Sequence, residues 1–195
     1  MNETEEFLLQ LAKSIQAWLW VESGLYALYA VLMQGANSHL VSVTFNSIQS
    51  VDAKLYLLNS CFTLTFARDS DEIKEWKKLS RKIEKLNKKR NKIVHEPVSI
   101  LHNNGIETIS LGPSLMNAMA LVKGQTTHKG SPVVSADYDQ DETNLLQDHK
   151  INIKDLSSLE RAFKTASFDL QAFREKVTPK LNTAQNQVNF SDEKP

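Results

Sequence analysis

The stretch from Lys74 to Pro97 constrains the fold more than any other part of this chain. Its apolar residues recur every three or four positions, which is the period of a helix with one buried stripe. The residues of this stripe are Ile73, Trp76, Leu79, Ile83, Leu86 and Ile93. Asp69 to Asp71 predict the N-terminal cap, and Pro97 predicts an end near His95, because proline disfavours helical geometry in the residue before it. We therefore expect one long helix here.

Three further segments have the same periodicity. The first helix is expected from about Thr4 to Gln34, and its apolar second half predicts a central place in a bundle or at a subunit interface. The second is expected from about Ser38 to Ala67, and the last from near Asp155 or Ser157 until Pro179 ends it. Short turns between long helices favour an antiparallel up-and-down arrangement. The sequence thus predicts an all-α fold with four main helices.

The segment of about 98–150 interrupts this pattern before the last helix. Two short apolar runs flank Asn104-Gly105, a dipeptide typical of β-hairpin turns, so we expect a small hairpin. Leu115 to Val122 is an apolar patch of undefined form, and Gly124 to Lys150 has the composition of a polar loop. The expected organisation is a single domain over residues 1–180, with this insertion, and a flexible tail over residues 181–195.

The C-terminal part of the Lys74 to Pro97 helix holds the candidate site residues. Arg90 falls seven positions after Ile83, which places it within about 20° of the buried stripe. A guanidinium there needs an anionic partner or a path to water. Glu22, which falls within the first apolar stripe, and Asp52, which lies beside Val51, could hold such a cation, although we favour a position at the wet edge of the stripe for both.

The run Arg90-Asn91-Lys92-Ile93-Val94-His95 resembles the R-x4–6-H motif of the HEPN superfamily, in which a polar residue directly follows the arginine. The family consists of antiparallel helices and includes metal-independent endoribonucleases of toxin–antitoxin and phage-defence systems. The resemblance covers about Glu5 to Pro97 and the final helix. One departure is that Glu96-Pro97 follows His95, where the family often has a tyrosine.

The resemblance implies a ribonuclease whose catalytic residues are Arg90, Asn91 and His95, in a homodimer whose two motifs face one cleft. Histidine has the resting pKa for proton transfer near neutrality, and the guanidinium fork fits phosphate oxygens. Asn91 could orient the phosphate or the histidine. Five positions on a helix correspond to about 140°, so either the helix unwinds before Pro97 or the arginine of one chain meets the histidine of the other.

Charge is unevenly distributed, although the 195 residues have a formal net charge of zero. Residues 74–95 contain ten Lys or Arg and two acids, and Asp137 to Asp148 contains five acids. The basic run is either a ridge that faces nucleic acid or the solvated face of a lysine-rich helix. In the first interpretation, Lys88, Lys89 and Lys92 bind RNA beside the motif.

Several classes of protein are disfavoured by the residues. Cys61 is the only cysteine, and the histidines have no metal-ligand spacing, so we expect no disulfide, metal or other cofactor. Phosphate-binding glycine loops and serine-hydrolase motifs are missing. The acidic N-terminus and the short apolar segments predict a cytoplasmic protein without a membrane span.

Two other functions are compatible with the sequence. A non-catalytic HEPN-like module could bind RNA, a nucleotide or a protein partner, and Arg90 and His95 would then be structural residues or ligand-holding residues. A helical antitoxin or immunity protein could instead use its acidic segment from Asp137 to Asp148 to engage a basic protein.

Overall fold

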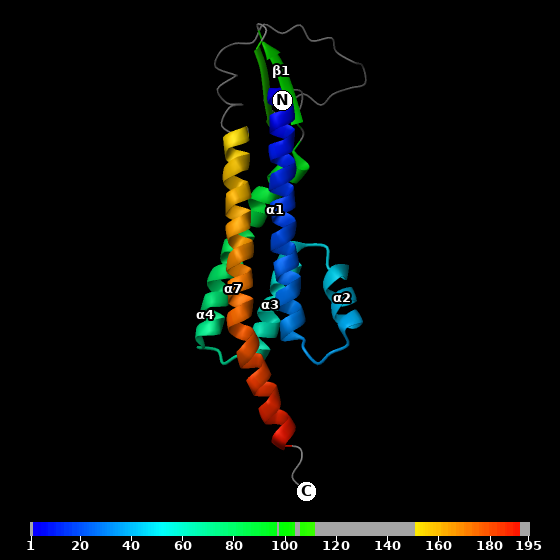
Figure 1. The fold of residues 1–195 in the computed structure, drawn as a ribbon, viewed down its shortest axis with the longest axis vertical. Helices are drawn as coiled ribbons and strands as arrows, with labels where there is room; N and C mark the ends of the chain where they lie inside the picture. The colour runs from blue at the N-terminus through cyan, green and yellow to red at the C-terminus, as the bar shows by residue number, and fades with distance from the viewer. Residues whose placement is uncertain (1, 97, 104–105, 112–150, 192–195) are drawn as a thin grey trace, which may run out of the picture.

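The computed structural model describes residues 2–96, 98–103, 106–111 and 151–191, and they are mostly helical (Figure 1). The helices are α1 (Glu3–Leu32), α2 (Ser38–Ser47), α3 (Val51–Thr65), α4 (Asp71–His95) and α7 (Ile153–Ser191). No helix in this described part is long and apolar enough to cross a membrane.

The ends of α1 and α4 follow from their cap residues. Asn2 and Glu5 form a capping box at the start of α1, where each side chain accepts a hydrogen bond from the backbone of the other residue. The Ser70 hydroxyl accepts from the Ile73 amide, so α4 begins at Asp71, as the sequence predicts. It ends at His95, and Glu96 is extended.

The predicted second helix is two helices, because the chain leaves helical geometry at Ile48 and α3 starts after a new cap at Ser50. Consecutive helices alternate in direction (Figure 1). With α2 and α3 separate, however, α1, α3 and α7 run in the same direction, and α4 runs against them. The prediction of four main helices is therefore wrong: the described residues form five.

Helix α1 has the central position that one interpretation of its sequence predicts, since it contacts α2, α3, α4 and α7. Its register with α7 is set by Trp18, which packs edge-on against Phe163 at 5.1 Å between ring centroids. Gly24 lies against Leu170, where a Cβ atom would come within 3.0 Å of Leu170 Cδ1, so the two helices approach closely at this point.

A cluster of aromatic rings joins α3, α4 and α7. The ring centroid of Phe62 lies 4.8 Å from that of Trp76 and 5.5 Å from that of Phe173, and all three rings are buried. Burial of such rings is the main source of stability in a helical core. Trp76 also donates a hydrogen bond of 2.6 Å to Asn59 Oδ1.

Helix α7 continues through Pro179 to Ser191, so the predicted helix end at Pro179 is wrong. The buried stripe of Phe173, Val177 and Leu181 spans the proline and keeps this part of α7 on the bundle. Residues 181–191, predicted as part of a flexible tail, are helical. The remainder of that tail, residues 192–195, lies outside the described residues.

Strands β1 (Val98–Asn103) and β2 (Ile106–Leu111) pair antiparallel, with Val98 opposite Leu111. Leu111 also exchanges two backbone hydrogen bonds with Ile151, at 3.1 and 2.9 Å, just before α7. The predicted apolar patch, polar loop and acidic segment between them fall in residues 112–150, outside the described residues.

Candidate functional site

Glu22 is the centre of a polar cluster at the junction of α1, α3 and α4. Its carboxylate accepts a hydrogen bond of 2.7 Å from Trp18 Nε1 and one of 3.3 Å from Lys54 Nζ. The Arg90 guanidinium lies 3.7 Å from it, measured from Nη2 to Oε1. One carboxylate thus faces two cations from different helices. The ion pair between Glu22 and Arg90 is therefore present, as one interpretation of the sequence predicts, and the Glu22 side chain keeps 23% exposure, as expected at the edge of the stripe.

Arg90 is partly buried, and its donors are not all used. Nη1 donates to Asn91 Oδ1 at 3.1 Å, whereas the buried Nε has no hydrogen-bond partner within the described part of the chain. One turn earlier, Asn87 is 5% exposed; it donates to Asp52 Oδ1 at 3.3 Å, and its own Oδ1 is likewise buried without a partner. Buried polar atoms without partners are uncommon in folded proteins, so Arg90 Nε and Asn87 Oδ1 are exceptions within this part of the chain.

Lys54 was missed by the sequence analysis. Its residue exposure is 8%, and its ammonium group lies 5.2 Å from the centroid of the Phe45 ring as well as beside Glu22. The only signal in the sequence is its place between Val51 and Leu55 in the buried stripe of α3. Its partner could not be read from the chain, because that partner comes from another helix.

His95 lies apart from this cluster. It is the exposed last residue of α4, which is helical throughout, so the alternative in which the helix unwinds before Pro97 is wrong. The side chains of Arg90 and His95 therefore leave the helix about 140° apart. Within one chain they do not form a common site. A cation in the last turn of a helix also complements the helix dipole, which is the structural alternative for His95.

The predicted RNA-binding lysines lie on the outer side of α4. Lys88 and Lys92 are two positions before and after Arg90, so each projects about 160° away from it, and Lys89 about 100° away. All three are exposed, and Lys88 pairs with Glu84 at 3.5 Å. Helix α4 thus separates the candidate residues: Arg90 faces α1, and the lysines face outward.

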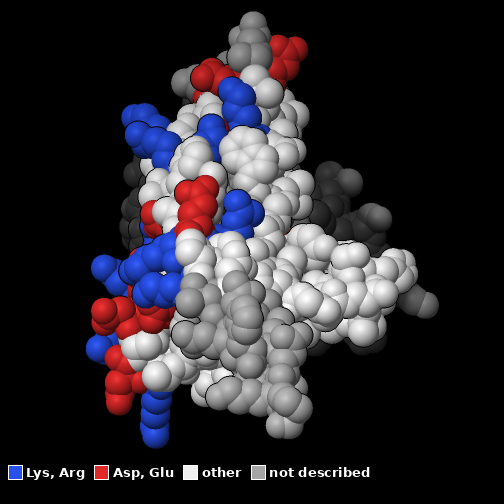
Figure 2. Space-filling model, turned by 60° about the horizontal axis from the view of Figure 1, so that its bottom comes forward, with Lys and Arg blue, Asp and Glu red and all other residues white. Residues whose placement is uncertain are grey.

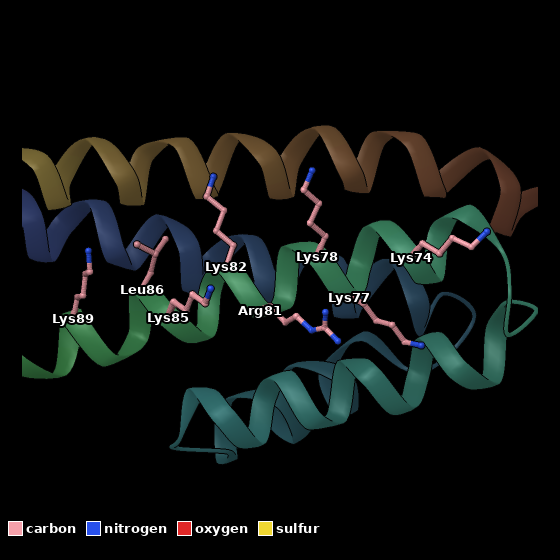
Figure 3. A pocket seen from close by; sticks show the side chains of 8 residues that line it. All are labelled: Lys74, Lys77, Lys78, Arg81, Lys82, Lys85, Leu86 and Lys89. Carbon is pink, nitrogen blue, oxygen red and sulfur yellow. The ribbon is translucent and has the colours of Figure 1, made fainter.

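The outer side of α4 also contains a shallow channel of about 670 Å³ (Figure 3). Its lining is basic except for Leu86, and consists of Lys74, Lys77, Lys78, Arg81, Lys82, Lys85, Leu86 and Lys89. Figure 2 shows that Lys and Arg side chains, interspersed with Asp and Glu, gather toward one side of the molecule, whereas the other side of this view carries almost no charge. The sequence indicated the basic run but not the channel.

Two carboxylates outside the cluster have lowered pKa values. The Lys180 ammonium group hydrogen-bonds Glu72 and holds the pKa of this buried carboxyl below its ordinary value. Lys164 and Gln10 likewise lower the pKa of Glu160. Glu72 thereby links α4 to α7, and Glu160 links α7 to α1, so both carboxylates help to pack α7.

Within the described residues, no group of three His, Cys, Asp or Glu side chains could hold a metal ion.

No protein-family model matches the chain, and neither a curated protein nor a solved structure is significantly similar to it. The HEPN resemblance therefore stays a prediction from the motif of residues 90–95.

Proposed function

We propose that this protein is a metal-independent endoribonuclease of the HEPN type that acts as a homodimer. The observation that carries the proposal is the position of Arg90: Glu22 and Asn91 orient its guanidinium, while its side chain stays 27% exposed. His95 projects from a different side of α4 and is exposed. The two residues can serve one reaction only if the arginine of one chain meets the histidine of a second.

In the proposed reaction, His95 removes the proton of a ribose 2′-hydroxyl, and the 2′-oxygen attacks the adjacent phosphorus. The Arg90 guanidinium stabilises the charge of the pentacoordinate phosphorane. The bond from phosphorus to the 5′-oxygen breaks, and the departing oxygen takes a proton from an acid in the shared cleft. The products are a 2′,3′-cyclic phosphate and a 5′-hydroxyl, so DNA should resist cleavage.

Apolar side chains beside Arg90 support the pairing of two chains. Helices α1 and α4 are antiparallel and meet at Glu22 and Arg90, so Leu19, one turn before Glu22, and Val94, one turn after Arg90, lie on the same side of this pair. Leu19 is 48% exposed and Val94 is 41% exposed. A second copy that covers these side chains would bring its own motif to the Arg90 cluster.

The direct test is cleavage of a mixed RNA pool by the purified protein in EDTA. We expect cut ends with cyclic phosphates, and we expect His95→Ala to abolish cutting while its circular dichroism and its dimer stay unchanged. The absence of cutting by a folded, dimeric wild-type protein would overturn the proposal.

Complementation tests the composite site. Arg90→Ala and His95→Ala are each expected to be inactive. In a refolded equimolar mixture, half the dimers pair one chain of each kind, and these restore one of two sites, so about a quarter of the wild-type activity should return. If Arg90→Ala does not fold, Arg90→Lys replaces it in the mixture, because lysine keeps a positive charge near Glu22. A mixture as inactive as its components would contradict the shared site.

A second candidate is a non-catalytic HEPN-like module that binds RNA, a nucleotide or a protein. It is favoured by the fact that Glu22 of the same chain already engages Arg90, as a purely structural ion pair would. In that case wild-type protein and His95→Ala are equally inert toward RNA, and Arg90→Ala lowers stability alone. The antitoxin alternative depends on Asp137 to Asp148, outside the described residues.

A further inference from the structure

The channel on α4 has two walls of cations. Lys78 and Lys82 reach toward α7, while Lys77 and Arg81 point away from it (Figure 3). Lys89 also lines a second depression of about 270 Å³ between α4 and α7. That depression is lined by Lys89, Lys92, Ile151, Asp155, Ser158, Leu159 and Ala162. From Lys74 to Lys92 the two depressions follow about 27 Å of the helix axis.

Most of these cations have no acidic partner within the described residues. Lys82 pairs with Asp169 at 2.7 Å, and Lys74 pairs with Asp71 at 3.6 Å. Among the described residues, no ion pair engages the remaining cations of the two depressions: Lys77, Lys78, Arg81, Lys85, Lys89 and Lys92. Like charges three and four positions apart on a helix repel one another. A ligand with regularly repeated negative charge relieves the repulsion within such a row of cations.

We propose that the α4 channel binds the phosphodiester backbone of a single-stranded nucleic acid. A stacked strand carries one phosphate per about 3.4 Å, so about eight phosphates fit along 27 Å. Lysines on both walls, together with Arg81, can neutralise such a chain without reading its bases. The contacts involve phosphates alone, so the channel accepts RNA and DNA.

A duplex fits this surface less well. The major groove of B-DNA is about 12 Å wide and admits one helix. Helix α4 cannot enter it alone, because Lys82 binds Asp169 and holds α7 along its side. The major groove of an RNA duplex is narrower and deeper still. A single strand can instead lie lengthwise between the two walls.

This site is separate from the proposed reaction, because the channel lies on the outer side of α4 and Arg90 faces α1. Binding here needs neither cleavage nor the composite cleft. A strand held in the channel would run along α4 toward Lys92 and the exposed His95, so the site would also present substrate if the ribonuclease proposal holds.

The test is fluorescence anisotropy of labelled 20-mers with His95→Ala protein, in EDTA, over a series of salt concentrations. Single-stranded RNA and DNA are expected to bind equally within about threefold, and duplexes more weakly. The double variant Arg81→Glu/Lys85→Glu should weaken single-strand binding by at least about tenfold and reduce the slope of log K against log salt by about 1.4.

The matched control is Lys13→Glu/Arg68→Glu, which changes the net charge equally with two exposed residues that line neither depression. It should weaken binding by less than about twofold. Equal losses in the two double variants, tighter binding of a duplex, or no binding at low salt would overturn the proposal. If binding behaves as expected while wild-type protein cuts no RNA, only the ribonuclease proposal fails. If cutting occurs and the channel variant binds normally, only the channel proposal fails.

Discussion

At the residue scale, Glu22 joins three helices through one side chain. Glu22→Gln leaves the ammonium group of Lys54, a residue that is 8% exposed, without a charged partner. We expect the free energy of unfolding to fall by about 1–3 kcal/mol, since an unpaired buried charge is costly and the residual exposure of Glu22 limits the loss. Urea denaturation measures this change.

Glu84→Gln is the matched control, because Glu84 also contacts a lysine, Lys88, but in an exposed pair. Its cost should stay below about 0.5 kcal/mol. Similar losses for the two variants would mean that the Glu22 cluster does not hold the helices together.

Glu72 gives the stability a defined dependence on pH. Its pKa is lowered in the folded protein, chiefly by the hydrogen bond from Lys180. The stabilisation is therefore fully present above the ordinary value of 4.5 and is lost as the pH falls from there through the lower folded pKa. Glu72→Gln should be less stable than wild type at pH 7, and the difference should shrink below pH 4.5 in urea titrations at several pH values. A difference that is independent of pH would contradict this role of Glu72.

The Glu22 cluster illustrates what a sequence discloses about single residues. The periodicity places Arg90 toward the packed side and limits its partners to acids beside other stripes, of which Glu22 is one. It does not reveal Lys54 as a competitor for the same carboxylate. That competition exists only because three helices meet at one level, which depends on tertiary packing.

At the scale of elements, Pro179 is a testable irregularity in α7. A proline inside a helix has no amide to donate to the carbonyl four residues earlier and crowds that turn. Because Val177 and Leu181 are buried on either side, α7 must be helical there regardless. Pro179→Ala should raise the free energy of unfolding by about 1–3 kcal/mol and slightly increase helical circular dichroism. Unchanged or lower stability would show that the proline fits its backbone without cost.

Two element boundaries could not be predicted, for opposite reasons. At Ile48 the apolar spacing of Phe45, Ile48 and Val51 runs on through the break, so a periodicity analysis sees one helix where a local cap at Ser50 starts another. At Pro179 the local rule predicts an end, and burial of the continuing stripe overrides it. At both ends of α4 the local end signals and the apolar periodicity indicate the same boundary, and the predicted bounds of this helix are confirmed.

At the scale of the whole molecule, the exposed apolar residues beside Arg90 predict how two chains would meet. Leu19→Lys/Val94→Lys should convert a dimer to a monomer in analytical ultracentrifugation, because two charges would be buried in the interface. The proposed ribonuclease activity should fall in parallel.

Leu64→Lys is the control. Leu64 is 88% exposed but lies at the far end of α3 from the Glu22 cluster, so its substitution should leave the dimer intact. A dimer that survives the Leu19 and Val94 substitutions would place the interface elsewhere.

The backbone bridge between Leu111 and Ile151 means that the chain departs from the helical body and returns to it at the same point. These two hydrogen bonds hold Leu111 and Ile151 side by side. Loop-closure entropy changes by only about 0.6 kcal/mol for each doubling of loop length. Replacing residues 112–150 by a short glycine–serine linker, or by a whole fluorescent protein, should therefore leave the helices packed. The bridge between Leu111 and Ile151 is therefore a site at which one connecting segment can be replaced by another without disturbing the helices.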